Sequence, residues 1–244
     1  TQIYLEKVDA GKIDFGISNP TDFFWGYTGI RTSKKAHKNL RFVANLHFFK
    51  TGLAVRDNSG IQSYNDLKGK RVPSGFRGAP GFHWNIKHKL LNAEPELGWD
   101  DVVRVPVTSL PGNWNAFRRG AVDVAIISVG AGHAKKLHAG AIADGGIRML
   151  SLNNGPAQER LLKGWPGFEV ITVNPNPRWP SIRKPTRIIT FPYIQLKKLA
   201  KNYLNKKLIN LNLKMNPNIT VMIATKSSKN IPISSLKLED EIIA

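Results

Sequence analysis

The chain alternates short apolar runs with turns that contain glycine or proline, and its first runs predict a helix followed by a strand. Apolar residues recur at helical spacing in residues 3–8, with no helix breaker before Gly11, so a helix is predicted to end at this glycine. Residues 12–18 form a short apolar run that predicts a buried strand. The polar turn sequence NPTD follows and ends the strand.

The same order of elements recurs later in the chain. Residues 112–119 predict a helix that Gly120 ends, and residues 122–128 predict the next strand. In AGKIDFGIS and in RGAVDVAIIS, a glycine, two residues and an aspartate lead into an apolar run that ends in serine. The repetition predicts two similar structural units, with Ser18 and Ser128 at the carboxyl ends of their strands.

Strands and helices alternate along the rest of the chain. Further strands are predicted at residues 40–48, 52–57, 70–75, 147–152 and 168–173, and further helices at residues 83–93, 155–164 and 195–208. Such alternation is typical of βαβ units, in which helices cover both faces of a mainly parallel sheet. We therefore predict an α/β fold with two lobes.

The carboxyl ends of these strands are the candidate ligand site. Ligands of open α/β sheets bind there because the following helix N-termini offer unpaired N–H groups and a positive dipole end. The residues expected to face a ligand are Ser18, Asn19, Thr21, Ser74, Gly75, Arg77, Gly78, Ala79, Ser128 and Gly130. A small anionic ligand fits this set best.

The glycine-rich turn SGFRGAPGF has two interpretations. It matches neither the dinucleotide-binding motif nor the P-loop, so its glycines can serve backbone geometry alone. Alternatively, the amides of this turn receive a carboxylate, with Arg77 as a bidentate partner. The sequence leaves both open, since Arg77 can equally point to solvent.

The acidic residues do not predict catalysis. Asp14 and Asp123 resemble a pair of catalytic carboxylates, but each follows a turn glycine and precedes a strand, where aspartate commonly caps its own turn. The chain contains neither a Gly-x-Ser-x-Gly elbow nor an HExxH motif. We expect no catalytic residue and no cofactor, and the alternative is a cleft enzyme of unknown reaction.

The histidines and tryptophans also favour structural roles. Two histidine pairs are spaced five residues apart, namely His83 with His88 and His133 with His138. This spacing separates the members by about 140° around a helix, so no metal site is expected and the histidines are predicted to be ordinary surface or core residues. The aromatic residues expected near a ligand are Phe24, Trp25 and Trp179.

Charge and composition narrow the classes of function. The 244 residues include 36 Lys and Arg against 17 Asp and Glu, which gives a formal net charge of +19 and favours anionic partners. The excess is spread along the whole chain, so a basic nucleic-acid-binding protein is the less favoured alternative. The absence of cysteine excludes disulfides and thiolate sites, and no apolar run is long enough to span a bilayer.

The segment NSGIQSYNDLKGKRVPSGF resembles the solute-binding subunits of TRAP transporters, specifically the TAXI family, through the phrase I-x-S-x-x-DLKGKRV. The phrases GWDDVVRVPV, FRRGAVDVAIISVGAGHAKKL, GGIRMLSLN and GWPGFEVITVNP continue the resemblance, which covers roughly residues 3–195. It implies a type 2 periplasmic-binding-protein fold, with two α/β lobes joined by crossover strands. On this pattern, lobe 1 comprises residues 1–55 and 175–244, and lobe 2 comprises residues 56–174.

The same resemblance implies a function. TAXI proteins are extracytoplasmic receptors, periplasmic in location, that capture a small organic acid or amino acid in an interlobe cleft and deliver it to a TRAP membrane permease. Family members begin with a strand and a glycine-rich loop, so lobe 1 is expected to lack part of its sheet here, and the chain carries no export signal. The expected partners are thus a small anionic ligand and the permease, with no nucleic acid.

Overall fold

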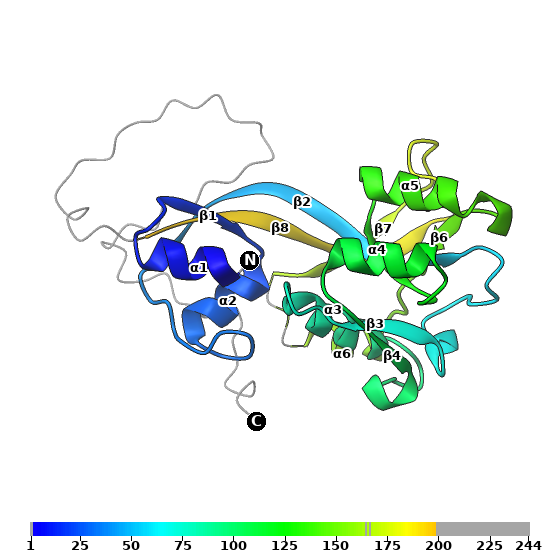
Figure 1. The fold of residues 1–244 in the computed structure, drawn as a ribbon, viewed down its shortest axis with the longest axis horizontal. Helices are drawn as coiled ribbons and strands as arrows, with labels where there is room; N and C mark the ends of the chain where they lie inside the picture. The colour runs from blue at the N-terminus through cyan, green and yellow to red at the C-terminus, as the bar shows by residue number, and fades with distance from the viewer. Residues whose placement is uncertain (1, 164, 166, 199–244) are drawn as a thin grey trace. The chain divides into compact units, whose positions relative to one another are not determined.

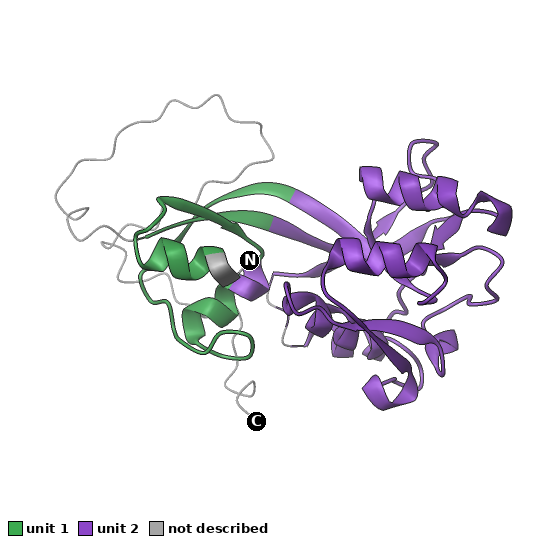
Figure 2. Ribbon diagram, in the orientation of Figure 1, with its two compact units in different colours: residues 1–19, 23–47, 193–244 green, residues 20–22, 48–192 purple. Residues whose placement is uncertain are grey.

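The chain forms two compact units, and two long strands contribute to both of them (Figure 2). The computed structural model describes residues 2–163, 165 and 167–198 (Figure 1). Unit 1 consists of Thr1–Asn19, Phe23–His47 and Tyr193–Ala244, and unit 2 consists of Pro20–Asp22 and Phe48–Pro192. The predicted architecture of two α/β units joined by crossover strands is confirmed.

The boundaries between the units lie within the two long strands, β2 (Leu40–Arg56) and β8 (Thr186–Lys198). They fall at residues 47/48 and 192/193, whereas the family pattern suggests 55/56 and 174/175. The apolar pattern also predicts two separate strands where β2 is continuous. No proline or paired turn residue interrupts the chain between the two runs, so the strand continues through them.

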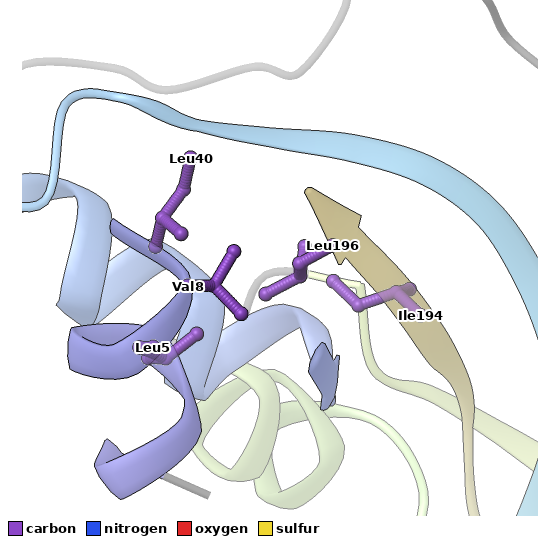
Figure 3. Packing of buried hydrophobic residues seen from close by; sticks show 5 residues of the cluster. All are labelled: Leu5, Val8, Leu40, Ile194 and Leu196. Atoms are coloured by element: carbon purple, nitrogen blue, oxygen red, sulfur yellow. The ribbon is translucent and has the colours of Figure 1, made fainter. Parts of the chain in front are cut away.

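In unit 1, α1 (Gln2–Asp9) packs on β1 (Phe15–Ser18), which pairs antiparallel with β8. A core cluster joins the helix to the strands β2 and β8 (Figure 3); its residues are Leu5, Val8, Leu40, Ile194 and Leu196. Gly16 permits the close approach of the helix, because a Cβ there would lie 2.9 Å from Cγ2 of Val8. The chain then enters α2 (Pro20–Thr28).

Unit 2 contains the alternating helices and strands that the sequence predicts, and also the strand β4, which is not predicted. Its elements are η1 (Asn65–Leu67), β3 (Arg71–Gly75), α3 (Gly81–Leu90), η2 (Trp99–Asp101), β4 (Val103–Val107), α4 (Leu110–Arg118), β5 (Ala125–Ser128), α5 (Gly132–Gly140), η3 (Ile142–Asp144), β6 (Ile147–Met149), α6 (Pro156–Leu162) and β7 (Glu169–Val173). Helix α3 packs on β3 and α6, and α4 packs on β4 and β5. Within the described residues, no helix is long and apolar enough to cross a membrane.

Strand direction differs from the mainly parallel sheets that the sequence predicts. The β3–β4 pair is parallel, but β1 and β7 pair antiparallel with β8, and β5 and β6 pair antiparallel with β2. Parallel neighbours require a crossover connection, which α3 provides between β3 and β4. The local alternation of helices and strands carries no information about most of these pairs, because β1 is distant in the sequence from β8, and β5 and β6 are distant from β2.

Strand β8 also replaces the beginning of a predicted helix. Residues 195–198 of the helix predicted at 195–208 belong to β8, and the remainder lies outside the described residues. Ile194 and Leu196 are buried, whereas Gln195 and Lys197 between and after them are half-buried. This alternation has the period of a strand, and the pairing with β1 selects it.

Helix α3 buries a lysine in unit 2. Lys89 is fully buried; its ammonium donates a hydrogen bond to Oδ1 of Asn85 and lies 5.8 Å from the ring centroid of Trp165. Burial lowers the pKa of Lys89 to about 7. The buried amine therefore reduces the stability of the fold at every pH below its ordinary pKa of 10.5.

We predict that Lys89→Met raises the free energy of unfolding at neutral pH by about 1 to 3 kcal/mol. Between the pKa of about 7 in the folded protein and the ordinary value of 10.5, the unfolded chain binds more protons, so wild-type stability should rise with pH across this window. The substitution should flatten that rise. Urea unfolding at both ends of the window measures it, with Lys87→Met on the same helix as control. Equal pH dependence in wild type and Lys89→Met would contradict the prediction.

Candidate ligand-binding site

The turn from β3 to α3 is fixed across the end of β4. Gly75 has a φ of 80° and Phe76 a φ of 49°, so two consecutive residues adopt the left-handed conformation. The N–H of Phe76 donates to the carbonyl of Val107 at 2.8 Å, and the N–H of Gly78 donates to the carbonyl of Thr108 at 3.0 Å. The side chain of Phe76 is fully buried and anchors the turn. Burial and these hydrogen bonds offset the backbone strain at Phe76.

This turn presents an arginine and two glycines on the surface of unit 2. Arg77 is exposed and makes no hydrogen bond or ion pair with any residue of the described chain. Gly75 and Gly78 are exposed as well, and Ala79 is half-buried. Ser74 is buried, with 5% of its surface exposed. The structure thus brings these five predicted residues into one turn, and their contact with a ligand stays a prediction.

A second turn follows β5, and an aromatic ring covers part of it. Ser128 is half-buried and Gly130, with a φ of 77°, is exposed. A Cβ at Gly130 would lie 3.0 Å from Nε1 of Trp179, so the indole lies against this turn. The ammonium of Lys50 lies 5.7 Å from the ring centroid of Trp179. The sequence does not single out Lys50, because it lies within the long strand β2 and belongs to no local motif.

Each of these two strand ends is fixed by a histidine of the following helix. The N–H of Gly75 donates to Nδ1 of His83, and the N–H of Ser128 donates to Nε2 of His133, both at 3.2 Å. A ring nitrogen accepts a hydrogen bond only when it carries no proton, so both imidazoles are neutral in this arrangement. The other ring nitrogen, Nε2 of His83 and Nδ1 of His133, then carries the N–H.

Tryptophan rings hold both imidazoles in place. His83 stacks on Trp99 with ring centroids 4.6 Å apart, and His133 stacks on Trp114 with ring centroids 3.9 Å apart. Burial lowers the pKa of each histidine. Both histidines therefore have structural roles, as the sequence predicts, and each fixes one strand end. The signal in the sequence is a histidine in the first turn of a helix that follows a strand.

Ser18, Asn19 and Thr21 lie at the start of α2. Ser18, in unit 1, is fully buried, and Thr21, which belongs to unit 2, is 3% exposed. Neither hydroxyl has a hydrogen-bond partner among the described residues, whereas the carbonyl of Asn19 accepts the N–H of Phe23 at 3.0 Å. Leaving a buried hydroxyl unpaired costs about 1 to 3 kcal/mol, so these two hydroxyls stay candidates for a ligand. Trp25 is 1% exposed and belongs to the core of unit 1.

The aspartates of the repeated phrase have different surroundings. Asp123 accepts the N–H of Arg71 at 2.7 Å and pairs with its guanidinium at 2.5 Å. Burial raises the pKa of Asp123, but the hydrogen bonds and charge of Arg71 outweigh burial and lower it overall. Asp14, in unit 1, is exposed. The predicted structural role of Asp123 is confirmed, although it caps the start of β3 and not its own turn.

We predict that Gly130→Ala displaces Trp179 and lowers the free energy of unfolding by about 1 to 2 kcal/mol, because a Cβ at a positive φ is strained. Gly132→Ala is the matched control, since its φ is not positive and no atom lies within 4 Å of its Cβ position. Denaturant unfolding and tryptophan fluorescence of the two variants measure the difference. Indistinguishable stabilities and spectra would show that Trp179 does not lie against Gly130.

Solved structures that are similar to this chain include proteins named as solute-binding proteins. The periplasmic aliphatic sulphonate binding protein SsuA from Escherichia coli is 23% identical over 60% of this chain and 42% of its own, with a TM-score of 0.41. The alkanesulfonate-binding protein SsuA from Xanthomonas axonopodis pv. citri is 22% identical over 62% and 47%, with a TM-score of 0.40. This chain thus spans less than half the length of either protein.

A further similar structure is the amino acid ABC transporter substrate-binding protein AbpA from Streptococcus pneumoniae, bound to L-arginine. It is 16% identical over 82% of this chain and 61% of its own, with a TM-score of 0.41. Among curated protein sequences, no match is found. The family model described as NMT1/THI5 like matches residues 2–140, which is more than half of the 244 residues. The protein therefore belongs to the NMT1/THI5-like family.

Proposed function

We propose that the protein is a solute-binding receptor of a membrane transport system, and that it binds a small anionic solute such as an organic acid or an amino acid. The observation that carries this proposal is the pair of turns after β3 and β5 in unit 2. Both turns expose glycine residues, and the first also exposes Arg77. Both lie at the carboxyl ends of strands, where α/β proteins bind their ligands.

The capping of the helices supports an anionic ligand. Helices α3, α4 and α5 follow the strands β3, β4 and β5, and α4 is capped by Ser109, whose Oγ accepts the N–H of Gly112 at 3.2 Å. The N-cap residues of α3 and α5 are Pro80 and Ala131, and neither makes a side-chain cap hydrogen bond. A helix N-terminus without a side-chain acceptor attracts negative charge through its N–H groups and dipole.

The histidines at these turns favour binding over general-base catalysis. A general base needs a free nitrogen lone pair within reach of the substrate. In His83 and His133 that lone pair accepts a backbone N–H, and the remaining ring nitrogen is a donor. These imidazoles can therefore stabilise the turns or donate to an anion, but they are not placed to abstract a proton.

The class of transporter is the finer part of the proposal. The phrase at residues 61–72 and the phrases after it resemble the TAXI family, so we propose a TRAP permease as the partner and an extracytoplasmic location. The similar structures are named for sulphonates and amino acids. Sulphonates and amino acids therefore belong in the set of solutes to test, beside mono- and dicarboxylates.

We predict that an anionic solute raises the melting temperature of the 244-residue chain. A ligand at a hundredfold excess over its Kd stabilises the folded state by about 2.7 kcal/mol. The measurement is a thermal-shift panel of L-glutamate, L-arginine, succinate, glutarate and alkanesulphonates, with neutral glutaramide as the control for glutarate. A cooperative melting transition that no member of the panel shifts would overturn the receptor proposal.

We predict that Arg77→Ala weakens binding of the best anionic solute by about 1.5 to 3 kcal/mol, because a guanidinium–carboxylate hydrogen bond is lost. Arg119→Ala is the control, since it removes the same charge from an exposed residue at the C-terminal end of α4. Isothermal titration calorimetry of both variants gives the comparison. Equal affinities would show that Arg77 points to solvent.

A further inference from the structure

The two turns after β3 and β5 both depend on the lone pair of an imidazole nitrogen. In each, the last strand residue donates its backbone N–H to a histidine in the first turn of the next helix, Gly75 to His83 and Ser128 to His133. A protonated imidazole has two N–H groups and no acceptor. Protonation would therefore remove the hydrogen bond and also place a second N–H against the first.

The surroundings of each ring prevent it from avoiding this conflict by turning over. His83 lies parallel to Trp99, with 12° between the ring planes, and His133 lies parallel to Trp114, with 11° between them. Trp114 is itself held, because its Nε1–H donates to the carbonyl of Ile126 at 2.8 Å. A flip of either ring about its Cβ–Cγ bond would put a ring C–H in place of the nitrogen, Cδ2 in His83 and Cε1 in His133, and a C–H cannot accept the backbone N–H. The repulsion can be relieved only by movement of the strand end.

The charged groups that act on the two rings favour the neutral form. Lys87 on α3 and Arg104 on β4 both lower the pKa of His83, after burial, which is the largest cause. For His133, burial is the cause of the lowered pKa, and no charged group in the described part of the chain contributes. Both rings are therefore neutral at pH 7 and gain a proton only below the ordinary value of 6.5.

We propose that His83 and His133 are positioning residues that hold the two ligand-binding turns of unit 2 only while both imidazoles are neutral, so that acid loosens both turns together. The ordering of the turns follows from the hydrogen bonds alone, and only its consequence for solute binding rests on the proposed function. If these turns bind the solute, a solute bound at neutral pH is released as the pH falls.

The two histidines accept through different nitrogens, which supplies matched variants. Nδ1 of His83 is bonded to Cγ, as is Oδ1 of an asparagine, so His83→Asn keeps an acceptor in place that does not titrate. Nε2 of His133 is one atom further out, as is Oε1 of a glutamine, so His133→Gln does the same there. The exchanged substitutions, His83→Gln and His133→Asn, put the acceptor at the wrong distance and are the controls.

The experiment is a pH titration of the ¹⁵N-labelled chain by NMR, without any ligand. In wild type, the scalar couplings across the hydrogen bonds Gly75–His83 and Ser128–His133 should be present at about pH 7 and absent at the acidic pH at which the imidazole ¹⁵N shifts report protonated rings. Hydrogen exchange at the amides of Gly75 and Ser128, corrected for its intrinsic pH dependence, should accelerate at least tenfold over the same range.

In His83→Asn and His133→Gln, slow exchange at the corresponding amide should persist at both pH values, whereas the exchanged substitutions should show fast exchange at both. The proposal is overturned if wild-type Gly75 and Ser128 stay protected after both imidazoles have titrated, and this outcome needs no variant to fold. Acid-sensitive turns in a protein that binds no solute would leave this inference standing while the receptor proposal fails. Acid-insensitive turns with solute binding would do the reverse.

Discussion

Backbone N–H groups at strand ends need hydrogen-bond acceptors, and this requirement determines the geometry of the candidate site. From the last paired residue of a strand onward, backbone amides lack a ladder partner, and in a packed unit they require another acceptor. After β3, the carbonyls of Val107 and Thr108 and the ring of His83 supply these acceptors. After β5, the ring of His133 supplies one. The turns are therefore fixed by hydrogen bonds to their neighbours, and Arg77 and the exposed glycines follow from that placement.

The sequence predicts the elements of unit 2 well because they are local. The helix and strand periods of residues 70–128 coincide with β3, α3, α4 and β5, and Gly120 ends α4 in the left-handed conformation as the pattern suggests. Strand direction in the larger sheet could not be predicted in this way. It depends on β2 and β8, whose partners other than β7 lie far away in the chain, and periodicity reports only the face that a residue occupies.

The candidate site could be predicted in part, for a similar reason. The two turns and Arg77 are visible as glycine-rich segments between a strand and a helix. Lys50 and Trp179 meet the second turn only through the fold, and nothing in their neighbouring residues marks them. The histidines are an intermediate case, because the spacing argument correctly disfavours a metal pair but does not ask which backbone group each ring reaches. Asking where every strand-end N–H finds its acceptor is the step that would have identified them.

Phe76 also limits how this turn can vary between related sequences. Its φ of 49° favours glycine, while its fully buried ring favours a large apolar side chain. Glycine would relieve the backbone and leave a cavity, and a β-branched residue would fill part of the cavity and strain the backbone. Every substitution therefore satisfies one requirement at the expense of the other. Both smaller and β-branched residues are therefore disfavoured at this position, although its side chain contributes no polar group to the site that it supports.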